Sequence, residues 1–456
     1  MGFLDENYLL GNEFSKKLFR EVSALPVVDP HNHADVKKIA DNTPFSDPWE
    51  LFAATDHYVW EMLRKCGVPE DLITGDVPNH EKWFAMAKVF PMFAGNPVYE
   101  WIHLDLRFLG FPDILLCEEN AQMLWDGCCA ALAKEENLPQ NLIRRENIET
   151  MCSTDDPADF LDNHERANKA FGRIVIRPTW RPDKVMKIRN RDFLAYLKKL
   201  GNRWNTNIRS TSDLLNVLKQ SHDYFAEHGA IASDHGIEFA YDGSVEEYQA
   251  EAILKKVLSG KDAAPADEIA WSSFLMKRFA LLDASRNWVF QMHIGAVRDV
   301  RYTLYNTIGA DSGGDVSDHE INIVKPLCKF LNKFDGILKV ALYCLDPGHQ
   351  ASMATVSRAF GSSVRLGSAW WFNDTPVGMK RQLEYISSVD LLSAFAGMVS
   401  DSRKLLSYAS RFEMFRRVLC DVVGAMVEQG RIPAQTASTL VRTVCYDAPK
   451  SFYNLN

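Results

Sequence analysis

Eight short apolar runs, separated by segments with helical spacing, are the feature of this sequence that most limits its fold. Each run is nearly continuous in hydrophobic residues and ends in polar ones, as in parallel strands covered by helices on both faces. The runs are Pro26–Asp29, Ile148–Ser153, Ile174–Trp180, Ala230–Ser233, Trp288–Ile294, Ile337–Tyr343, Val364–Ser368 and Leu392–Ser400. Eight such units favour an α/β fold of the closed (β/α)8 TIM barrel type, with an open doubly wound sheet as the alternative.

Residues from about 40 to 145 interrupt this alternation. The stretches 57–66, 80–93 and 119–135 have helical spacing and many aromatic residues, and strand signals are few. No linker rich in Pro, Gly or Ser marks the edges of this region. We therefore expect a single domain over residues 1–456, a distorted barrel with a helical insertion after its first strand.

The charge and cysteine content limit the partners and the compartment. A formal net charge of −9 argues against a nucleic-acid partner, and an anionic substrate would need local Arg or Lys. No apolar run reaches the roughly 20 residues of a membrane span, and we expect no secretory leader. The nine cysteines are scattered without a CxxC pair, so reduced thiols in a cytoplasmic protein are expected.

Polar residues of unusual kinds stand at the expected strand ends, where a barrel of this type carries its chemistry. His31 and His33 are the sharpest of these signals. Two residues apart on an extended backbone, their imidazoles point the same way and can share a divalent cation. The pair alone also fits ordinary loop histidines. His293 and Asp401, at the ends of other strands, would add a third nitrogen and a carboxylate, although His293 also fits a buried core histidine.

Two arginines and a tyrosine are further candidates. Arg181 and Arg403 have the planar fork that matches a carboxylate, and each also has a neighbouring aspartate, Asp183 or Asp401, for a structural ion pair. Tyr58 stands at the start of the helical insertion, where it is either a hydroxyl donor over the barrel mouth or a packed side chain.

For three other polar residues the structural role is the simpler one. His235 follows Asp234, which offers it a hydrogen-bond partner. Asp155 and Asp156 precede Pro157, so one of them can cap the following helix. Whether these three residues join the site is left open.

The motifs resemble those of the uronate isomerase (glucuronate isomerase) family, in the amidohydrolase superfamily of metal-dependent barrels. The matching stretches cover nearly the whole chain and occur in the order of the family. They are residues 29–35, 55–68, 95–107, 153–164, 177–184, 233–238, 291–299, 366–374 and 397–420.

The resemblance implies a reversible aldose–ketose isomerisation of D-glucuronate to D-fructuronate and of D-galacturonate to D-tagaturonate. A proton would move from C2 to C1 through a cis-enediol. The family binds one divalent metal ion, usually zinc, and the matching positions here are His31, His33 and Asp401, with His293 as a further ligand or active-site histidine.

The same resemblance implies roles for the remaining candidates. Asp401 would be the base that takes the C2 proton, Tyr58 would donate to a substrate oxygen, and Arg181 or Arg403 would hold the C6 carboxylate of the hexuronate. The active-site tryptophan of the family falls on Trp370.

One departure leaves the preferred uronate open. After the fifth-strand histidine the family is closer to an Asn-rich NNNTR, whereas this chain has residues 299–303, DVRYT. The native metal, the oligomeric state (a homo-oligomer included) and closure of the insertion as a lid are equally open. Two other functions compete: a metal-dependent hydrolase of the same superfamily, which would use the same histidines and aspartate, and a non-catalytic uronate-binding protein.

Overall fold

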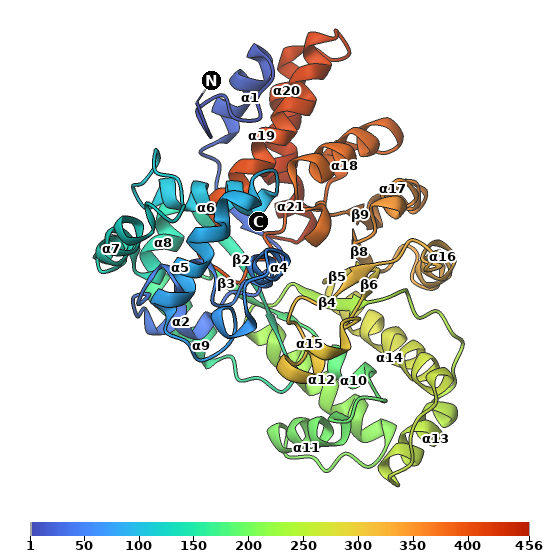
Figure 1. Cartoon of the computed structure of the whole chain (residues 1–456). Helices are drawn as coiled ribbons and strands as arrows, with labels where there is room; N and C mark the ends of the chain where they lie inside the picture. The colour runs from blue at the N-terminus through green and yellow to red at the C-terminus, as the bar shows by residue number, and fades with distance from the viewer. Residues whose placement is uncertain (1, 456) are drawn as a thin grey trace.

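The computed structural model describes residues 2–455, and its centre is a curled sheet of seven parallel strands surrounded by helices (Figure 1). The strand order is β1-β2-β3-β4-β5-β8-β9, so each strand pairs with the next one along the ring. The strands are β1 (Val27–Asp29), β2 (Ile148–Asp155), β3 (Ile176–Trp180), β4 (Ala232–Ile237), β5 (Val289–Ile294), β8 (Lys339–Cys344) and β9 (Val364–Leu366). Most of their side chains are buried, which explains the continuous apolar runs. The predicted α/β barrel is confirmed.

Residues 396–402 connect the two edges of this sheet. Ala396 N donates a hydrogen bond to Leu366 O of β9, and Asp401 N donates to His31 O, just beyond β1. The predicted eighth strand, Leu392–Ser400, is wrong in its local geometry. Its start is a 3-10 helix, and the rest is irregular because Gly397 takes a φ of 121°, outside the extended region.

Helices cover the outside of the sheet. Those that follow β2 are α9 (Asp162–Phe171), α10 (Asp183–Met186), α11 (Phe193–Arg203), α12 (Thr211–Glu227), α13 (Glu247–Leu258), α14 (Pro265–Arg286), α16 (Val324–Lys333), α17 (Gln350–Ala359), α18 (Pro376–Val389), α19 (Ser407–Glu428), α20 (Ala434–Arg442) and α21 (Ala448–Phe452). Among residues 2–455 no helix is both long and apolar enough to cross a membrane.

The chain between β1 and β2 folds as helices, as the sequence indicates. They are α2 (Val36–Asp41), α3 (Pro48–Phe52), α4 (His57–Lys65), α5 (Asn79–Val89), α6 (Pro97–Phe108), α7 (Ala121–Leu132) and α8 (Pro139–Arg145). The start of α4 is fixed by Asp56, whose side chain accepts a hydrogen bond from Tyr58 N at 2.9 Å. That this region and the barrel form one domain stays a prediction.

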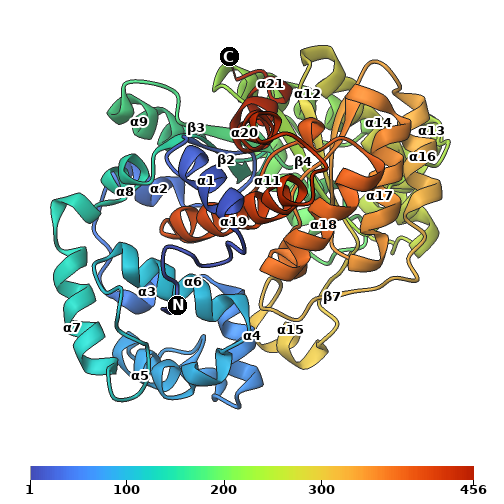
Figure 2. The same ribbon diagram turned by 90° about the horizontal axis from the view of Figure 1, so that it is seen from above.

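The first helix, α1 (Glu13–Val22), lies along α19 near the other end of the chain, as both ribbon views show (Figures 1 and 2). The two helices approach so closely that a Cβ on Gly424 would stand 2.6 Å from the backbone nitrogen of Ser15. A glycine is therefore required at this crossing.

A small excursion after β5 projects over the carboxyl ends of the strands. It contains α15 (Tyr302–Ile308) and an antiparallel pair, β6 (Ala296–Val297) with β7 (Val316–Ser317). Arg64 of α4 donates a hydrogen bond to Ser312 O, which connects this excursion to the helical region near α4 (Figure 2).

Candidate active site

A cavity of about 1020 Å³ opens at the carboxyl ends of the strands, where the sequence places the site. Most of the predicted site residues line it. They are His31, His33, Asp155, Asp156, Arg181, His293, Trp370, Asp401 and Arg403. Residues from six segments far apart in the chain therefore face one space.

Three donor atoms meet at one side of this cavity. His31 Nε2 and His33 Nε2 each lie 3.2 Å from Asp401 Oδ1, and the three groups together form a set able to hold a metal ion. Two imidazoles and a carboxylate are a usual donor set for zinc and similar divalent ions. The residues present therefore fit a divalent cation.

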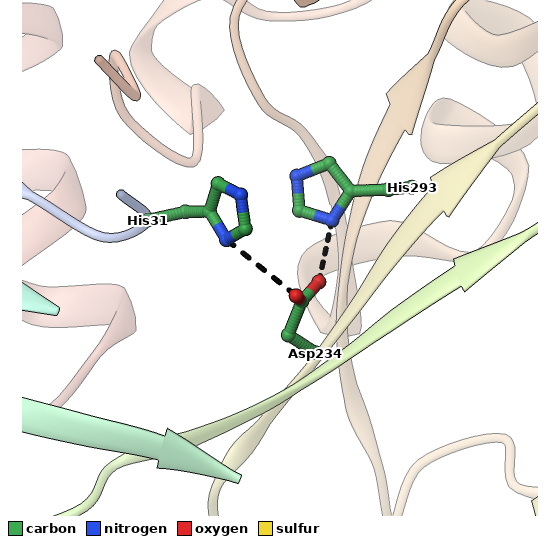
Figure 3. A group of neighbouring side chains, drawn as sticks. All are labelled: His31, Asp234 and His293. Carbon is green, nitrogen blue, oxygen red and sulfur yellow. Dashed lines mark hydrogen bonds and ion pairs between the residues drawn. The ribbon is translucent and has the colours of Figure 1, made fainter. Parts of the chain in front are cut away.

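A buried carboxylate orients two of the histidines. Asp234 Oδ1 lies 2.6 Å from His293 Nδ1, and Asp234 Oδ2 lies 3.7 Å from His31 Nδ1 (Figure 3). A metal-binding histidine commonly directs its second nitrogen at such a carboxylate, which fixes the tautomer. Although His31, Asp234 and His293 also form a possible metal group, Asp234 already lies 3.3 Å from Arg181 Nε, so we assign it the orienting role.

The second nitrogen of His293 is free for another partner. With Nδ1 bonded to Asp234, Nε2 of His293 is buried and has no hydrogen-bond partner within the described chain. A neutral imidazole in this tautomer presents a lone pair at Nε2. His293 can therefore accept a proton or a hydrogen bond, or bind a metal, as the sequence analysis expects.

Burial and charge set the protonation of the site. Burial would raise the pKa of Asp401, but hydrogen bonds from His31 and His33, and the charge of these rings when protonated, hold it well below the usual value. Burial lowers the pKa of His33 to about 4 and that of His293 to about 4. These two imidazoles are thus neutral near pH 7, the form that binds metal and accepts protons.

The other oxygen of Asp401 is held by a tryptophan. Trp370 Nε1 donates a hydrogen bond to Asp401 Oδ2 at 3.0 Å, and the Trp370 ring lies edge-on to His293. Asp401 itself has a φ of 47°, a left-handed conformation that aspartate tolerates better than most residues. Both features limit how the carboxylate can turn.

The two candidate arginines differ in their partners. Arg181 Nε is bonded to Asp183 Oδ2 at 2.9 Å, so the structural ion pair considered for it is formed. Arg403 lines the cavity, and within the described chain it makes no ion pair with Asp401. The guanidinium of Arg403 is therefore the one left open to an anionic ligand.

Tyr58 does not line the cavity, but its neighbour His57 does. The two rings stack with centroids 4.8 Å apart, and the Tyr58 hydroxyl is buried without a hydrogen-bond partner in the described chain. Burial, together with the charge of Asp401, raises the pKa of Tyr58 well above its usual value, so the phenol stays protonated.

His235 lies outside the cavity. It is fully buried between Phe279 and Phe290, with Ser233 Oγ 2.8 Å from its Nε2. Because side chains alternate along β4, Asp234 points to the inside of the barrel, beneath the cavity residues His31 and His293, when His235 points to the surrounding helices. Asp234 is thus bonded to His293 and not to His235.

Asp155 and Asp156 lie on the cavity wall with structural partners. Asp156 accepts hydrogen bonds from Ala158 N and Tyr196 OH, both at 2.9 Å. The following helix, α9, begins at Asp162 after Leu161, so neither aspartate caps it, and the capping role considered for them is wrong. Asp155 accepts from Ser153 Oγ at 2.7 Å.

Sequence reasoning missed two residues of this site, Asp234 and His57. Asp234 was missed because the predicted strand ended at Ser233. In the structure β4 continues to Ile237, which places residue 234 within the strand. The signal for His57 was its position directly after the helix cap Asp56, one residue before Tyr58.

Comparison with known proteins agrees over the whole chain. The sequence model of the glucuronate isomerase family matches residues 1–453. The uronate isomerase of Thermotoga neapolitana is 48% identical over 451 residues, 99% of each chain. The crystal structure of uronate isomerase from Thermotoga maritima superposes with a TM-score of 0.97 at 47% identity, covering 99% of this chain and 100% of that one. For the crystal structure of glucuronate isomerase from Caulobacter crescentus the TM-score is 0.93 at 27% identity, with 99% and 97% covered.

Proposed function

Since this chain belongs to the glucuronate isomerase family, we propose that it interconverts a hexuronate and its keto-uronate in the cavity lined by His31, His33 and Asp401. The substrates are D-glucuronate, giving D-fructuronate, and D-galacturonate, giving D-tagaturonate. The observation that carries the proposal is the meeting of a metal-type donor set and an unpaired arginine in one cavity.

The substrate carboxylate is bound by arginine in this proposal. The protein as a whole is negatively charged, so local cations have to attract the hexuronate. Arg403 is open to a bidentate contact with the C6 carboxylate, whereas Arg181 shares its charge with Asp183 and Asp234. Arg403 is therefore the first choice for the clamp, and Arg181 the second.

One divalent ion, zinc in our proposal, would be held by His31, His33 and Asp401, with His293 beside it. When bound, such an ion polarises a carbonyl and neutralises the negative charge of an enediolate.

The proton transfer is assigned to Asp401. Its ionised carboxylate takes the C2 proton of the open-chain aldose and returns it to C1, which converts the aldehyde carbon to a hydroxymethyl group. The hydroxyl proton on O2 has to move to O1 in the same conversion. In a cis-enediol these two oxygens lie on the same side, so one donor can serve both. Tyr58 is the proposed donor of the proton to O1, and it regains a proton from O2 by way of His57, which stacks on it and lines the cavity.

We also propose that the enzyme works in the cytoplasm. The support is that all nine cysteines are free thiols, the form kept by a reducing compartment.

The test is proton NMR of D-glucuronate, and separately D-galacturonate, with metal-replete protein in D₂O. We expect keto-uronate signals that disappear after chelation of the metal, and deuterium at C2 of recovered substrate. If neither sugar changes in protein that contains metal, the isomerase proposal fails. Cleavage of simple lactones or amides would then support the hydrolase, and uronate binding without turnover would support the non-catalytic protein.

A further inference from the structure

Arg411 on α19 is a buried cation next to the site that the proposed chemistry does not use. Only 2% of the residue is exposed, and it does not line the cavity. Its Nη1 donates two hydrogen bonds, to Asp374 Oδ2 at 2.6 Å and to the backbone oxygen of Ser400 at 2.7 Å. Burial of a guanidinium costs free energy unless the group is paired in this way. The presence of Arg411 in the interior therefore suggests that its hydrogen bonds have a role there.

Ser400 is held from both sides. Its backbone nitrogen and its hydroxyl donate to the two oxygens of buried Asp29, at 3.0 and 2.6 Å, while its carbonyl oxygen accepts from Arg411. These side-chain bonds occur where the regular ladder of the barrel is missing. The next residue is Asp401, whose left-handed φ of 47° is not maintained by any strand.

Arg411 also supports a second side chain of the site. Its guanidinium carbon lies 5.0 Å from the ring centre of Tyr58 and 4.2 Å from that of Trp101, and Trp101 packs edge-on against Tyr58. One guanidinium therefore contacts the residue before Asp401 and the ring of Tyr58 at the same time.

The neighbouring arginines of the same helix are directed elsewhere. Arg416 is also buried, and it donates to the backbone oxygens of Ser23, Leu25 and Pro26, at the start of the chain. Arg416 therefore offers a matched control for the loss of a buried arginine from α19.

We propose that Arg411 is a positioning residue. It fixes Asp401 through the Ser400 carbonyl, and it holds the ring of Tyr58 in place by packing against it. The inference rests on the proposed function for the role of Asp401. Arg411 does not touch the substrate in this proposal, and its effect passes through the two residues it holds.

The test replaces the ion pair as a whole, because Arg411→Met alone leaves Asp374 buried and unpaired. Exchange of a buried ion pair for apolar residues of similar volume often preserves folding. We therefore compare Arg411→Met/Asp374→Leu with Arg416→Met and the wild type, using zinc affinity by chelator competition, Tm, kcat and KM. For the double variant we expect a 10- to 100-fold weaker zinc affinity, the loss typical of a displaced supporting group. We also expect kcat to fall at least tenfold with KM changed less than threefold, and Arg416→Met to keep wild-type zinc affinity and kcat.

A second measurement separates positioning from a general loss of structure. In an Asp401→Asn background, Arg411→Met/Asp374→Leu should weaken zinc binding less than twofold further, since the residue it positions no longer binds as a carboxylate. Equal losses in both backgrounds, or wild-type zinc affinity in the double variant, would overturn the inference. The comparison of zinc affinities does not depend on turnover. If the isomerase assay fails but the double variant still loses zinc affinity in the wild-type background and not in the Asp401→Asn background, the proposed function is rejected and the positioning role stands.

Discussion

At the scale of single residues, Asp401 has two roles in our proposal, as a metal ligand and as the base, and a single substitution can separate them. Its Oδ1 faces two imidazoles and its Oδ2 accepts from Trp370. An amide in its place keeps the size of the side chain and one acceptor oxygen but cannot take up a proton from carbon.

We predict that Asp401→Asn lowers kcat by 10²- to 10⁴-fold, the range for loss of a general base. Uronate binding should remain measurable by calorimetry at saturating zinc. Asp262→Asn, at an exposed surface position, serves as the control. Retained turnover in Asp401→Asn would remove Asp401 from the proton transfer.

Asp234 supports the metal donors without facing the ion in our assignment. Its two oxygens lie next to Nδ1 of His31 and of His293. Asparagine offers only one oxygen, so it cannot accept from both rings. We predict that Asp234→Asn weakens zinc affinity 10- to 100-fold, measured by competition with a fluorescent chelator. Asp183→Asn, which contacts Arg181 but neither histidine, should have a much smaller effect. Equal affinities of Asp234→Asn and wild type would contradict the orienting role.

Much of the site was accessible from the sequence at this scale. The spacing of His31 and His33 alone predicts that their rings share one side of an extended chain, and the structure places both against Asp401. Asp234 was out of reach, because an error of four residues in the end of β4 turns a strand residue inside the barrel into an apparent loop residue. Arg411 gave no signal, since its contacts with Ser400 and Tyr58 depend on tertiary packing.

At the scale of elements, the contact of α1 with α19 depends on a missing side chain. A Cβ on Gly424 would clash with Ser15 Oγ and would stand 2.6 Å from Ser15 N and 2.8 Å from Ser15 Cα. Two of these three atoms belong to the backbone of α1, so the clash cannot be relieved by a side-chain rotation.

We predict that Gly424→Ala lowers the free energy of unfolding by about 1–3 kcal/mol, the usual cost of overpacking. This sign is opposite to the gain of up to about 1 kcal/mol that alanine normally brings to a helix. Urea unfolding measures the change, and Glu428→Ala on the exposed end of the same helix is the control. A variant more stable than the wild type would show that α1 shifts freely along α19.

The elements of the barrel were predictable to different degrees. Strands β2 to β9 of the main sheet are buried on both faces, and burial of this kind leaves a clear apolar run in the sequence. The segment before Asp401 has the same apolar composition, but its Ser400 is bonded to β1 through the Asp29 carboxylate and not through a backbone ladder. Composition does not distinguish these two modes of closure, so the predicted eighth strand failed there.

At the scale of the whole molecule, buried acids make stability depend on pH. Asp105 is fully buried, and burial, partly offset by Lys404, raises its pKa to about 6 from 3.8. The folded protein thus keeps a proton that the unfolded chain releases. The contribution of Asp105 to stability is present below pH 4 and is lost as the pH rises through about 6.

We predict that Asp105→Asn gains stability relative to the wild type between pH 4.5 and 7, by about 2 kcal/mol. Asparagine resembles the protonated acid and has no proton to lose. Urea unfolding of metal-free protein at both pH values measures this difference, and Asp113→Asn at an exposed site should show none. A pH-independent difference between Asp105→Asn and wild type would mean that Asp105 ionises normally in the folded protein.

The distance along the chain between the donors has a consequence for how the protein is made. His31 and Asp401 are 370 positions apart and yet lie in contact. At 5–20 residues per second a ribosome needs roughly 20–70 s to pass from one to the other. During that interval the two histidines have left the ribosome without their carboxylate partner. In our proposal, metal loading is then one of the last events of biosynthesis, because it waits for the emergence of Asp401.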